Sequence, residues 1–476
     1  MTRVVILGAG VAGLAAAYRL LELQPHWEVY VFEQEPTAGG LARKWQIGQF
    51  SADLGPHRIY TELPEIERLL PELIESDQAL VVERRSELLL QNHFYTYPVR
   101  ATELLREMGF LRMGFLALSA VGGRLRALIK QPSNYAEAMV HAFGRGVYEL
   151  IIRPYTQKVW KTPPEALSEE IARVRVSAGN TNRLVRRLIG APERKGQQTA
   201  LGTFTYIRGG VENLVRNLAQ RVERGGGHLE TGWQATNLQI EENRVRSVGF
   251  RALDGTQQRR VACDYVISTI PLPELVEMVA EHIPVQAAQE AARRLEYVGM
   301  ILVGVAFRRP QLTPNTWLYF PEEHLVFNRA YEPRNFDPSM APEGSTLVVF
   351  EVTARWDSHL WRMTDEQIGE LVVHDLLAVG LARREEIESV ACQRLRHAYP
   401  IYTRGFRTEL EKVCRELAQV PNLLSTGRQG LFNHNNMDHS MLMGIRAAET
   451  LALQPMEPAP AWYANLHQFD HFRIVD

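Results

Sequence analysis

Arg3–Leu7 reads RVVIL, Gly8–Gly13 reads GAGVAG and Glu28–Phe32 reads EVYVF. The first and third segments are short apolar runs rich in β-branched residues, which predicts two buried parallel strands. Leu14–Leu23, between them, is predicted to be helical, so the order is strand, glycine turn, helix, strand. This order predicts an α/β domain in which the first helix begins directly at the glycine turn.

The segment Gly8–Gly13 is a G-x-G-x-x-G motif, and each glycine in it has its own role. Gly8 permits the tight turn, Gly10 lets the backbone approach a pyrophosphate, and Gly13 lets the helix pack closely on the strand. The free N–H groups and the positive dipole end of the helix favour an anion there. Glu33 follows Gly13 by 20 residues and can accept hydrogen bonds from ribose hydroxyls, which argues against a 2′-phosphate. The segment therefore predicts a dinucleotide site.

After Glu33 the chain continues with a second glycine pair, Gly39-Gly40, and with Arg43. This E-x(5)-G-G-x-x-R pattern resembles the extended FAD signature of the glutathione-reductase-type family. That family includes amine oxidases, protoporphyrinogen oxidases, carotenoid desaturases and UDP-galactopyranose mutases. The resemblance implies that the dinucleotide is FAD and that Gly39, Gly40 and Arg43 lie along its pyrophosphate and flavin edge.

The resemblance covers nearly the whole chain and implies its domain organisation. The expected fold class is α/β, with a discontinuous FAD-binding Rossmann domain of the glutathione-reductase type and an inserted α+β substrate domain. We expect the FAD-binding domain to comprise residues 1–80, 203–290 and 420–455. The substrate domain should comprise residues 81–202 and 291–419, and residues 456–476 should form a C-terminal tail.

Two later segments resemble the parts of the mutases that surround the flavin. Ser51–Thr61 (SADLGPHRIYT) resembles a loop whose His contacts the flavin, and His57 is the matching position. Thr426–Glu449 resembles the second flavin motif, in which a strand end is followed by a helix. Either Asn436 or Asp438 is a natural N-cap for that helix, whose dipole would face the flavin. The positions implied in cofactor binding are Arg428, Asn436 and Asp438.

Other positions match residues on the substrate side of the mutases. Tyr319 and Arg329 match a Tyr and an Arg that bind the substrate and its diphosphate, and a guanidinium fork with Tyr hydroxyls suits that group. Tyr399 matches another hydroxyl on the phosphate side, and Arg173 matches an Arg that faces the diphosphate. His434 stands near the place of a Tyr that holds a phosphate oxygen, in a motif that is two residues shorter here. A protonated His434 could take that role, but the departure leaves the UDP-galactose assignment open.

Two functions from different classes therefore remain. The resemblance favours the first, a redox-neutral isomerase of a nucleotide sugar, similar to the UDP-galactopyranose mutases, that uses reduced FAD with NAD(P)H or a reductase as electron donor. The second is an oxidase or dehydrogenase in which a porphyrinogen, an amine or a polyene loses hydride to oxidised FAD. A third possibility is a structural FAD. Two or more arginines converging on the flavin would favour a diphosphate substrate, whereas an apolar tunnel would favour oxidation of an apolar one.

Composition excludes several other classes. The 476 residues carry 53 Lys+Arg and 55 Asp+Glu, for a formal charge of −2, so nothing draws the whole chain to nucleic acid or to an anionic membrane. Three cysteines without a C-x-x-C pair predict neither a metal site nor a disulfide framework, and they fit a reducing cytoplasm. Motifs of serine hydrolases, P-loop proteins and zincins are missing from the sequence. We expect a cytoplasmic enzyme with a small-molecule substrate and no signal peptide.

Phe110–Ile129 is the most apolar long segment of the sequence. Arg112, Arg124 and Arg126 interrupt it, so we do not expect a membrane-spanning helix. The favoured prediction is a helix packed on the chain's own core. The alternative is a helix that lies on a membrane surface.

Overall fold

A five-stranded parallel sheet carries the first glycine turn. Its strand order is β19-β13-β1-β2-β9, and its bounds are Arg3–Leu7 for β1, Glu28–Glu33 for β2, His228–Thr231 for β9, Tyr265–Ser268 for β13 and Leu423–Ser425 for β19. Each pair in it is parallel. The computed structural model describes residues 1–97, 99, 101–175 and 202–474. Val4–Leu7 are buried, which confirms the predicted buried strand.

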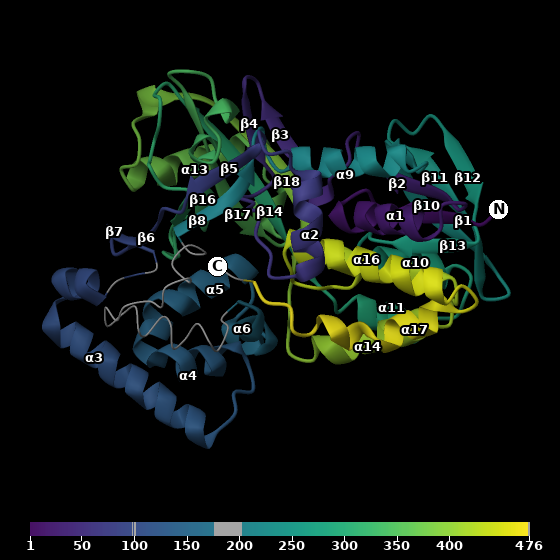
Figure 1. The fold of residues 1–476 in the computed structure, drawn as a ribbon. Coiled ribbons are helices and arrows are strands. Elements are labelled where there is room, and N and C mark those ends of the chain that lie inside the picture. The colour runs from purple at the N-terminus through teal and green to yellow at the C-terminus, as the bar shows by residue number, and fades with distance from the viewer. Residues whose placement is uncertain (98, 100, 176–201, 475–476) are drawn as a thin grey trace.

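Helices cover one face of this sheet, and a small antiparallel sheet lies against the other. Helix α1 (Val11–Leu23) packs on α9 (Glu212–Arg224) and α16 (Met437–Leu453) (Figure 1). The antiparallel sheet comprises β10 (Trp233–Glu241), β11 (Arg244–Ala252) and β12 (Gln258–Ala262). The rings of Phe32 and Phe250 stack between the two sheets with their centroids 3.9 Å apart.

The second large sheet has seven strands in the order β18-β14-β17-β16-β15-β6-β7. Their bounds are Ile387–Pro400, Tyr297–Phe307, Thr346–Ala354, Arg329–Tyr331, Trp317–Tyr319, Ser86–Leu90 and His93–Thr96, in that order. Every residue of β14 is buried. Its residues alternate between two cores, because side chains of a strand point to opposite faces. Ile301 and Val303 pack in the core that contains α13 (Asp365–Ala378), whereas Met300 and Leu302 pack in the core shared with the parallel sheet.

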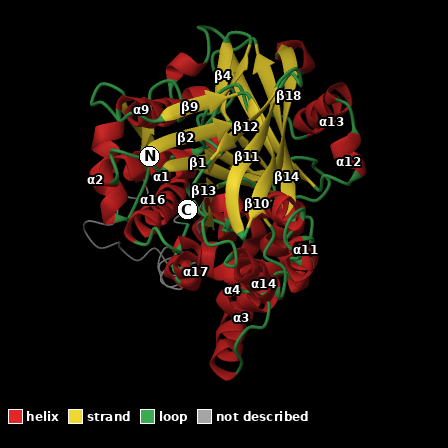
Figure 2. Cartoon of the chain, turned by 90° about the vertical axis from the view of Figure 1, so that its right-hand side faces the viewer, coloured by secondary structure: helices red, strands yellow, loops and turns green. Residues whose placement is uncertain are grey.

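A layer of helices extends from the seven-stranded sheet. It contains α3 (Ala101–Ile129), α4 (Tyr135–Val147), a π-helical turn (Tyr148–Ile152), α5 (Arg153–Trp160) and α6 (Glu170–Arg175). Helix α3 projects from the body of the protein, as Figures 1 and 2 show from two sides. None of the described helices combines the length and the hydropathy that a bilayer span requires.

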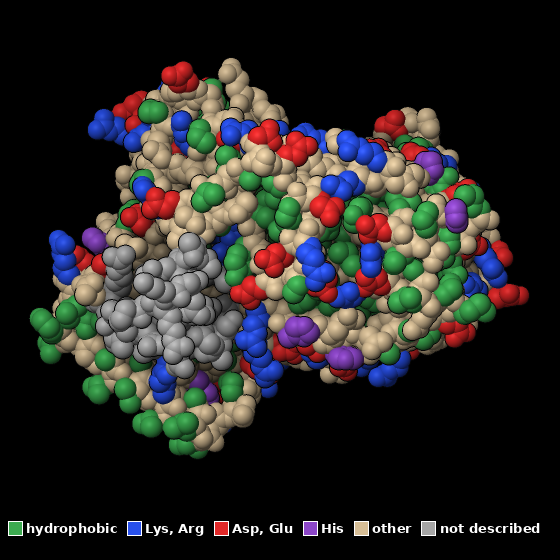
Figure 3. All heavy atoms as spheres, viewed as in Figure 1, with side chains coloured by type: hydrophobic (Ala, Val, Ile, Leu, Met, Phe, Trp, Pro, Cys, Tyr) green, Lys and Arg blue, Asp and Glu red, His purple; other side chains and the backbone are tan. Residues whose placement is uncertain are grey.

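The outer face of α3 corrects one prediction. Phe110–Ile129 was expected to pack on the chain's own core, but Leu111 is 94% exposed and Ile129 is 86% exposed. Only the inner face packs on α4, where a Cβ added at Gly123 would lie 2.2 Å from the carbonyl oxygen of Val140. Hydrophobic side chains gather on the surface over α3 in Figure 3. The sequence showed that this segment is apolar, but it did not show which faces of the helix would find a partner in the fold.

The C-terminal tail packs on the parallel sheet. Helix α17 (Pro458–Ala464) follows α16, and the Trp462 indole donates a hydrogen bond to the Ser425 carbonyl at 2.8 Å. The remaining strands form two antiparallel pairs, the hairpin β3 (Lys44–Ile47) with β4 (Phe50–Asp53), and β5 (Ala79–Glu83) with the sequence-distant β8 (Thr203–Ile207). The remaining helices are α2 (Pro64–Leu73), α10 (Leu272–Ala280), α11 (Gln286–Ala292), α12 (His359–Arg362), α14 (Phe406–Leu417) and α15 (Gly427–Gly430). The fold class is α/β as predicted, and the exact domain boundaries stay a prediction.

Candidate functional site

The two glycine motifs lie side by side at the carboxyl end of β1. Gly8 has a φ of +97°, and a Cβ at Gly13 would lie 2.0 Å from the Gly8 carbonyl oxygen, so the turn requires glycine at both positions. The N–H of Gly39 donates to the carbonyl of Ala9 at 2.9 Å, which ties the second glycine pair to the first turn. Gly8, Gly10, Gly39 and Gly40 line a single large cavity, whereas Gly13 supports the turn from behind.

Glu33 and Arg43 are held in place at the wall of the same cavity. The Glu33 carboxylate accepts hydrogen bonds from the backbone N–H groups of Ala9 at 2.9 Å and Glu35 at 3.0 Å. Burial raises the pKa of Glu33 from its ordinary value. Arg43 donates to the Gly40 carbonyl and pairs with Glu35 at 2.8 Å. The hydrogen bond from a ribose hydroxyl to Glu33 stays a prediction.

The second flavin motif contacts α1 and lines the same cavity. Asn436 is the N-cap of α16 and forms a capping box with His439, as its position before the helix predicted. Asp438 lies in the first turn and lines the cavity. Its Oδ1 is buried and receives no hydrogen bond from the described residues, so a polar ligand atom would complete it. Arg428 lines the cavity with its guanidinium over the Tyr399 ring, 4.6 Å from the centroid. These groups fit a dinucleotide such as FAD.

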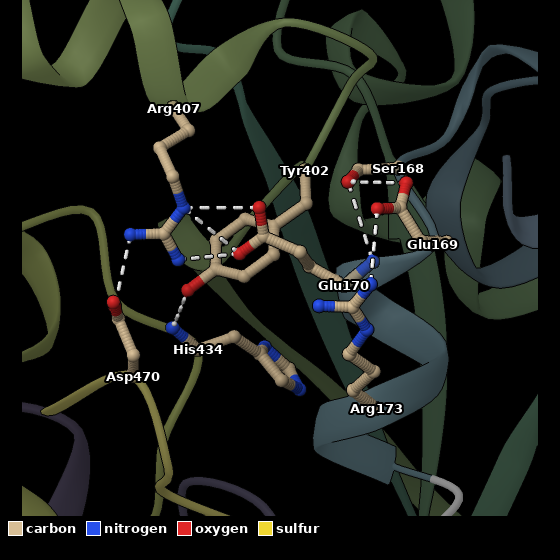
Figure 4. A network of polar contacts seen from close by, with 8 residues as sticks. All are labelled: Ser168, Glu169, Glu170, Arg173, Tyr402, Arg407, His434 and Asp470. Carbon is tan, nitrogen blue, oxygen red and sulfur yellow. Dashed lines mark hydrogen bonds and ion pairs between the residues drawn. The ribbon is translucent and has the colours of Figure 1, made fainter. Parts of the chain in front are cut away.

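Four of the five residues predicted on the substrate side line the same cavity, namely Tyr319, Arg329, Tyr399 and His434, and His57, predicted beside the flavin, lines it too. Arg173 is not among the lining residues. Its side chain is 71% exposed and pairs with Glu169 at 3.4 Å, on the far side of the Tyr402 ring from Asp470 in Figure 4. A role for Arg173 with a diphosphate stays a prediction that the geometry does not support.

Arg329 does not present an uncompensated charge to the cavity. Its Nε and Nη2 donate to the two carboxylate oxygens of Glu351 at 3.0 and 2.8 Å, and Glu351 is 1% exposed. Glu351 belongs to β17 and faces Arg329 across the β16–β17 ladder. The sequence analysis did not identify this partner, because nothing local relates the two strands.

An aromatic cluster surrounds His434. Its ring lies 5.4 Å from the rings of both Trp160 and Tyr399. Its backbone N–H donates to the Tyr402 hydroxyl at 2.7 Å (Figure 4). Trp160 lies beside His434 at the cavity wall. A role for His434 in holding a phosphate stays a prediction.

His57 is half-buried, with its Nδ1 4.0 Å from Oδ2 of the buried Asp53, a residue that the sequence did not single out. Burial and the nearby guanidinium groups of Arg428 and Arg329 lower the pKa of His57 to about 4, so its ring is neutral at neutral pH. Asp53 accepts hydrogen bonds from the Tyr206 hydroxyl at 2.6 Å and from the Val211 N–H at 3.1 Å. Burial nevertheless raises the pKa of Asp53 to about 7. The position of Asp53 at the end of β4, just before the His57 loop, is the sequence feature that could have identified it as a site residue.

The pKa of Asp53 predicts a pH-dependent stability. Because the folded protein binds this proton more tightly than the unfolded chain, the contribution of Asp53 is present at low pH and falls as pH rises from about 4 to about 7. The slope should reach at most about 1.4 kcal/mol per pH unit. Asp53→Asn should remove it, measured by urea unfolding of the FAD-loaded protein across this range. The exposed Asp77→Asn should keep the wild-type slope; equal slopes for Asp53→Asn and wild type would contradict the assignment.

The cavity continues from the glycine motifs into the layer of helices. Its volume is about 1960 Å³, roughly twice the upper end of the usual range for a ligand pocket. It therefore has room for a dinucleotide and a second molecule. We call its far end the apolar chamber. The described residues that line the apolar chamber are Leu88, Val99, Leu104, Met113, Leu116, Ala117, Ala120, Val121, Met139, Phe143, Val147, Leu150, Ile151 and Ile152, with Arg124 as the charged member.

Comparisons with known proteins agree with this site. Over 445 residues the chain is 24% identical to a phytoene dehydrogenase of Streptomyces griseus, which covers 80% of this chain and 81% of the relative. It is 23% identical over 460 residues to a coproporphyrinogen III oxidase of Staphylococcus aureus, covering 89% and 94% of the two chains. A crystal structure of reduced UDP-galactopyranose mutase superposes with a TM-score of 0.80 at 24% identity, over 100% of this chain and 98% of the other. That likeness shows the fold.

The family assignment rests on most of the chain. Residues 11–452 match the model of flavin-containing amine oxidoreductases, and this range includes the second glycine pair, the apolar chamber and the second flavin motif. The cofactor is FAD, as the glycine motifs predicted, and the protein is an enzyme. The chain belongs to the family of flavin-containing amine oxidoreductases.

Proposed function

We propose that this protein is an FAD-dependent dehydrogenase or oxidase of a large apolar substrate. The observation that carries the proposal is the apolar chamber, which belongs to the same cavity as the cofactor groove. The described residues that α3, α4 and the π-helical turn contribute to the cavity wall are apolar or aromatic except for Arg124. FAD, when bound, accepts a hydride from such a substrate. The relatives from Streptomyces griseus and Staphylococcus aureus are named as a dehydrogenase and an oxidase, which supports this class of reaction.

The residues of this chain would bind the substrate and exclude water from it, rather than hold it by charge. The side chains of the apolar chamber would hold the substrate by burial of its apolar surface. The neutral His57 ring adds no positive charge to the cavity wall, and the Arg329 charge is balanced by Glu351. A polyene or a similar unsaturated molecule fits such surroundings better than a diphosphate does.

A second candidate is the isomerase of a nucleotide sugar that uses reduced FAD. One observation favours it. Arg329 and Arg428 both act electrostatically on His57, and Tyr319 and Tyr399 line the same end of the cavity. Arginines and hydroxyls in such an arrangement suit a diphosphate. The pairing of Arg329 with Glu351 weighs against this candidate.

One anaerobic experiment separates the two functions. Oxidised holoprotein is mixed with phytoene in detergent, with coproporphyrinogen III or with putrescine, and the visible absorbance of oxidised flavin is followed. We expect phytoene or the porphyrinogen to bleach it. In a parallel sample, dithionite-reduced holoprotein receives UDP-galactofuranose, and UDP-galactopyranose is sought by chromatography. Conversion in that sample, without bleaching in the first three, would replace the proposed function with the second candidate.

Filling the apolar chamber should slow the reaction without removing FAD. Ala120 lines the chamber from α3, so Ala120→Phe places a ring in space that the substrate needs. We expect flavin reduction at least about ten-fold slower, with flavin content unchanged. Ala127→Phe makes the same exchange at an exposed position of the same helix that does not line the cavity and serves as the matched control. Equal rates for the two variants would show that the substrate does not enter the chamber.

A further inference from the structure

The outer face of α3 is apolar over most of its length, and no element among the described residues covers it. The most exposed large side chains are Phe110, Leu111, Phe115, Leu118, Leu128 and Ile129, each of them at least 66% exposed. Residues 111, 115, 118, 125 and 129 follow helical spacing and form one stripe. From Phe110 to Ile129 the stripe is about 30 Å long. An apolar surface of this extent marks a site of interaction with another body.

The charges within this segment are basic. Residues 108–134 contain Arg112, Arg124, Arg126 and Lys130 and no Asp or Glu, whereas Glu103 and Glu107 precede the segment. Lys130 is paired with Glu137 of α4 at 2.8 Å, so the three arginines supply the positive excess. Two copies of this face would bring like charges together, without acidic partners inside the segment, which disfavours self-association. A bilayer that contains anionic lipids offers both an apolar interior and negative headgroups. Charge complementarity therefore favours a lipid surface over a second copy of the chain.

The inner face of the same helix forms a wall of the apolar chamber. Met113, Leu116 and Ala120 point to the chamber, while Leu111, Phe115 and Leu118 point to solvent. The thickness of one helix thus separates the exposed apolar face from the apolar chamber. A substrate dissolved in a membrane would need to cross only this layer to reach the cofactor groove.

We propose that α3 seats the protein on the surface of an anionic bilayer and that the apolar substrate enters the chamber from that bilayer. The helix lies in the interface with its axis along the membrane plane, because its arginines exclude a spanning arrangement. The seating stands on the exposed face and its charges alone. The entry of substrate rests also on the proposed function. The proposal replaces the expectation, drawn from the near-neutral overall charge, that a membrane is not a partner.

Sedimentation of the FAD-loaded protein with vesicles tests the seating. We expect the wild type to sediment with vesicles of phosphatidylcholine and phosphatidylglycerol, less with phosphatidylcholine alone, and less at high salt. The triple variant Leu111→Ser, Phe115→Ser, Leu118→Ser should lose at least about ten-fold in vesicle affinity. The double variant Leu453→Ser, Met456→Ser removes two exposed apolar side chains from the other end of the molecule and should bind as the wild type does.

Flavin content shows whether each variant is folded, and sedimentation velocity reports the oligomeric state. A wild type that ignores both kinds of vesicle would overturn the seating, and a dimer that the triple variant breaks would assign the face to a second copy. Entry is tested by flavin reduction with phytoene in vesicles and in detergent, where the triple variant should be slower only with vesicles. Vesicle binding without any flavin reduction would leave the seating intact and refute the proposed function.

Discussion

Gly13→Ala is expected to abolish tight FAD binding. The added Cβ would lie 2.0 Å from the carbonyl oxygen of Gly8 and 3.3 Å from Ile6 Cγ2. No side-chain rearrangement can relieve the clash with the oxygen, because the backbone fixes the positions of both the Cβ and the oxygen. The turn must open, which moves α1 away from β1 and displaces the helix N-terminus that should hold the pyrophosphate. We expect purified Gly13→Ala to contain little flavin, and its apoprotein to bind added FAD at least about 100-fold more weakly than wild type.

A glycine elsewhere in a helix provides the matched control. Gly114 lies inside α3, and a Cβ there would meet nothing within 4 Å. Gly114→Ala should therefore keep the wild-type flavin content and gain slightly in stability, by about 0.5–1 kcal/mol. Absorbance of flavin per polypeptide and titration of apoprotein with FAD measure both variants. Wild-type affinity in Gly13→Ala would mean that the turn does not hold the cofactor.

The cofactor half of the site was predictable because it is local in sequence. Gly8, Gly13 and Glu33 lie within one βαβ unit, where spacing alone fixes which backbone groups meet. The N-cap at Asn436 was predictable for a similar reason, since capping depends on neighbours within one turn. Each of these features follows from short-range geometry, so a pattern of residues suffices to identify it.

The substrate half was less predictable because its decisive contacts join distant segments. Arg329 and Glu351 are paired across two strands, and Asp53 meets Tyr206 from 153 positions away. The apolar segment Phe110–Ile129 was predicted to pack on the chain's own core, but the sequence could not show that one face of α3 would stay exposed. Tyr319, Tyr399 and His434, which the resemblance named, line the cavity, whereas Arg173, which it also named, lies outside the lining. Tertiary partners, which a single sequence does not record, decide whether a residue of the right type can act.

Arg329→Met is expected to destabilise the protein strongly, and adding Glu351→Leu is expected to restore most of the loss. Removing the guanidinium leaves a buried carboxylate without its partner, which costs about 3–5 kcal/mol. Replacing both groups by apolar side chains removes the unpaired charge, and such exchanges are often neutral or stabilising. Urea unfolding of the FAD-loaded proteins measures the two single variants and the double variant. The exposed pair Arg384–Glu370 supplies the control, because Arg384→Met should unfold close to wild type.

The same variants decide what Arg329 is for. If the pair mainly satisfies two buried charges, the double variant regains stability. Calorimetry then detects no binding of UDP to the wild type, so neither Arg329 variant has an affinity to lose. If Arg329 instead holds a diphosphate, the wild type binds UDP, and both the single and the double variant lose that affinity, whatever their stability. The second outcome would favour the nucleotide-sugar isomerase over the dehydrogenase. The bidentate contacts at 2.8 and 3.0 Å use two of the three guanidinium nitrogens, so we expect the first outcome.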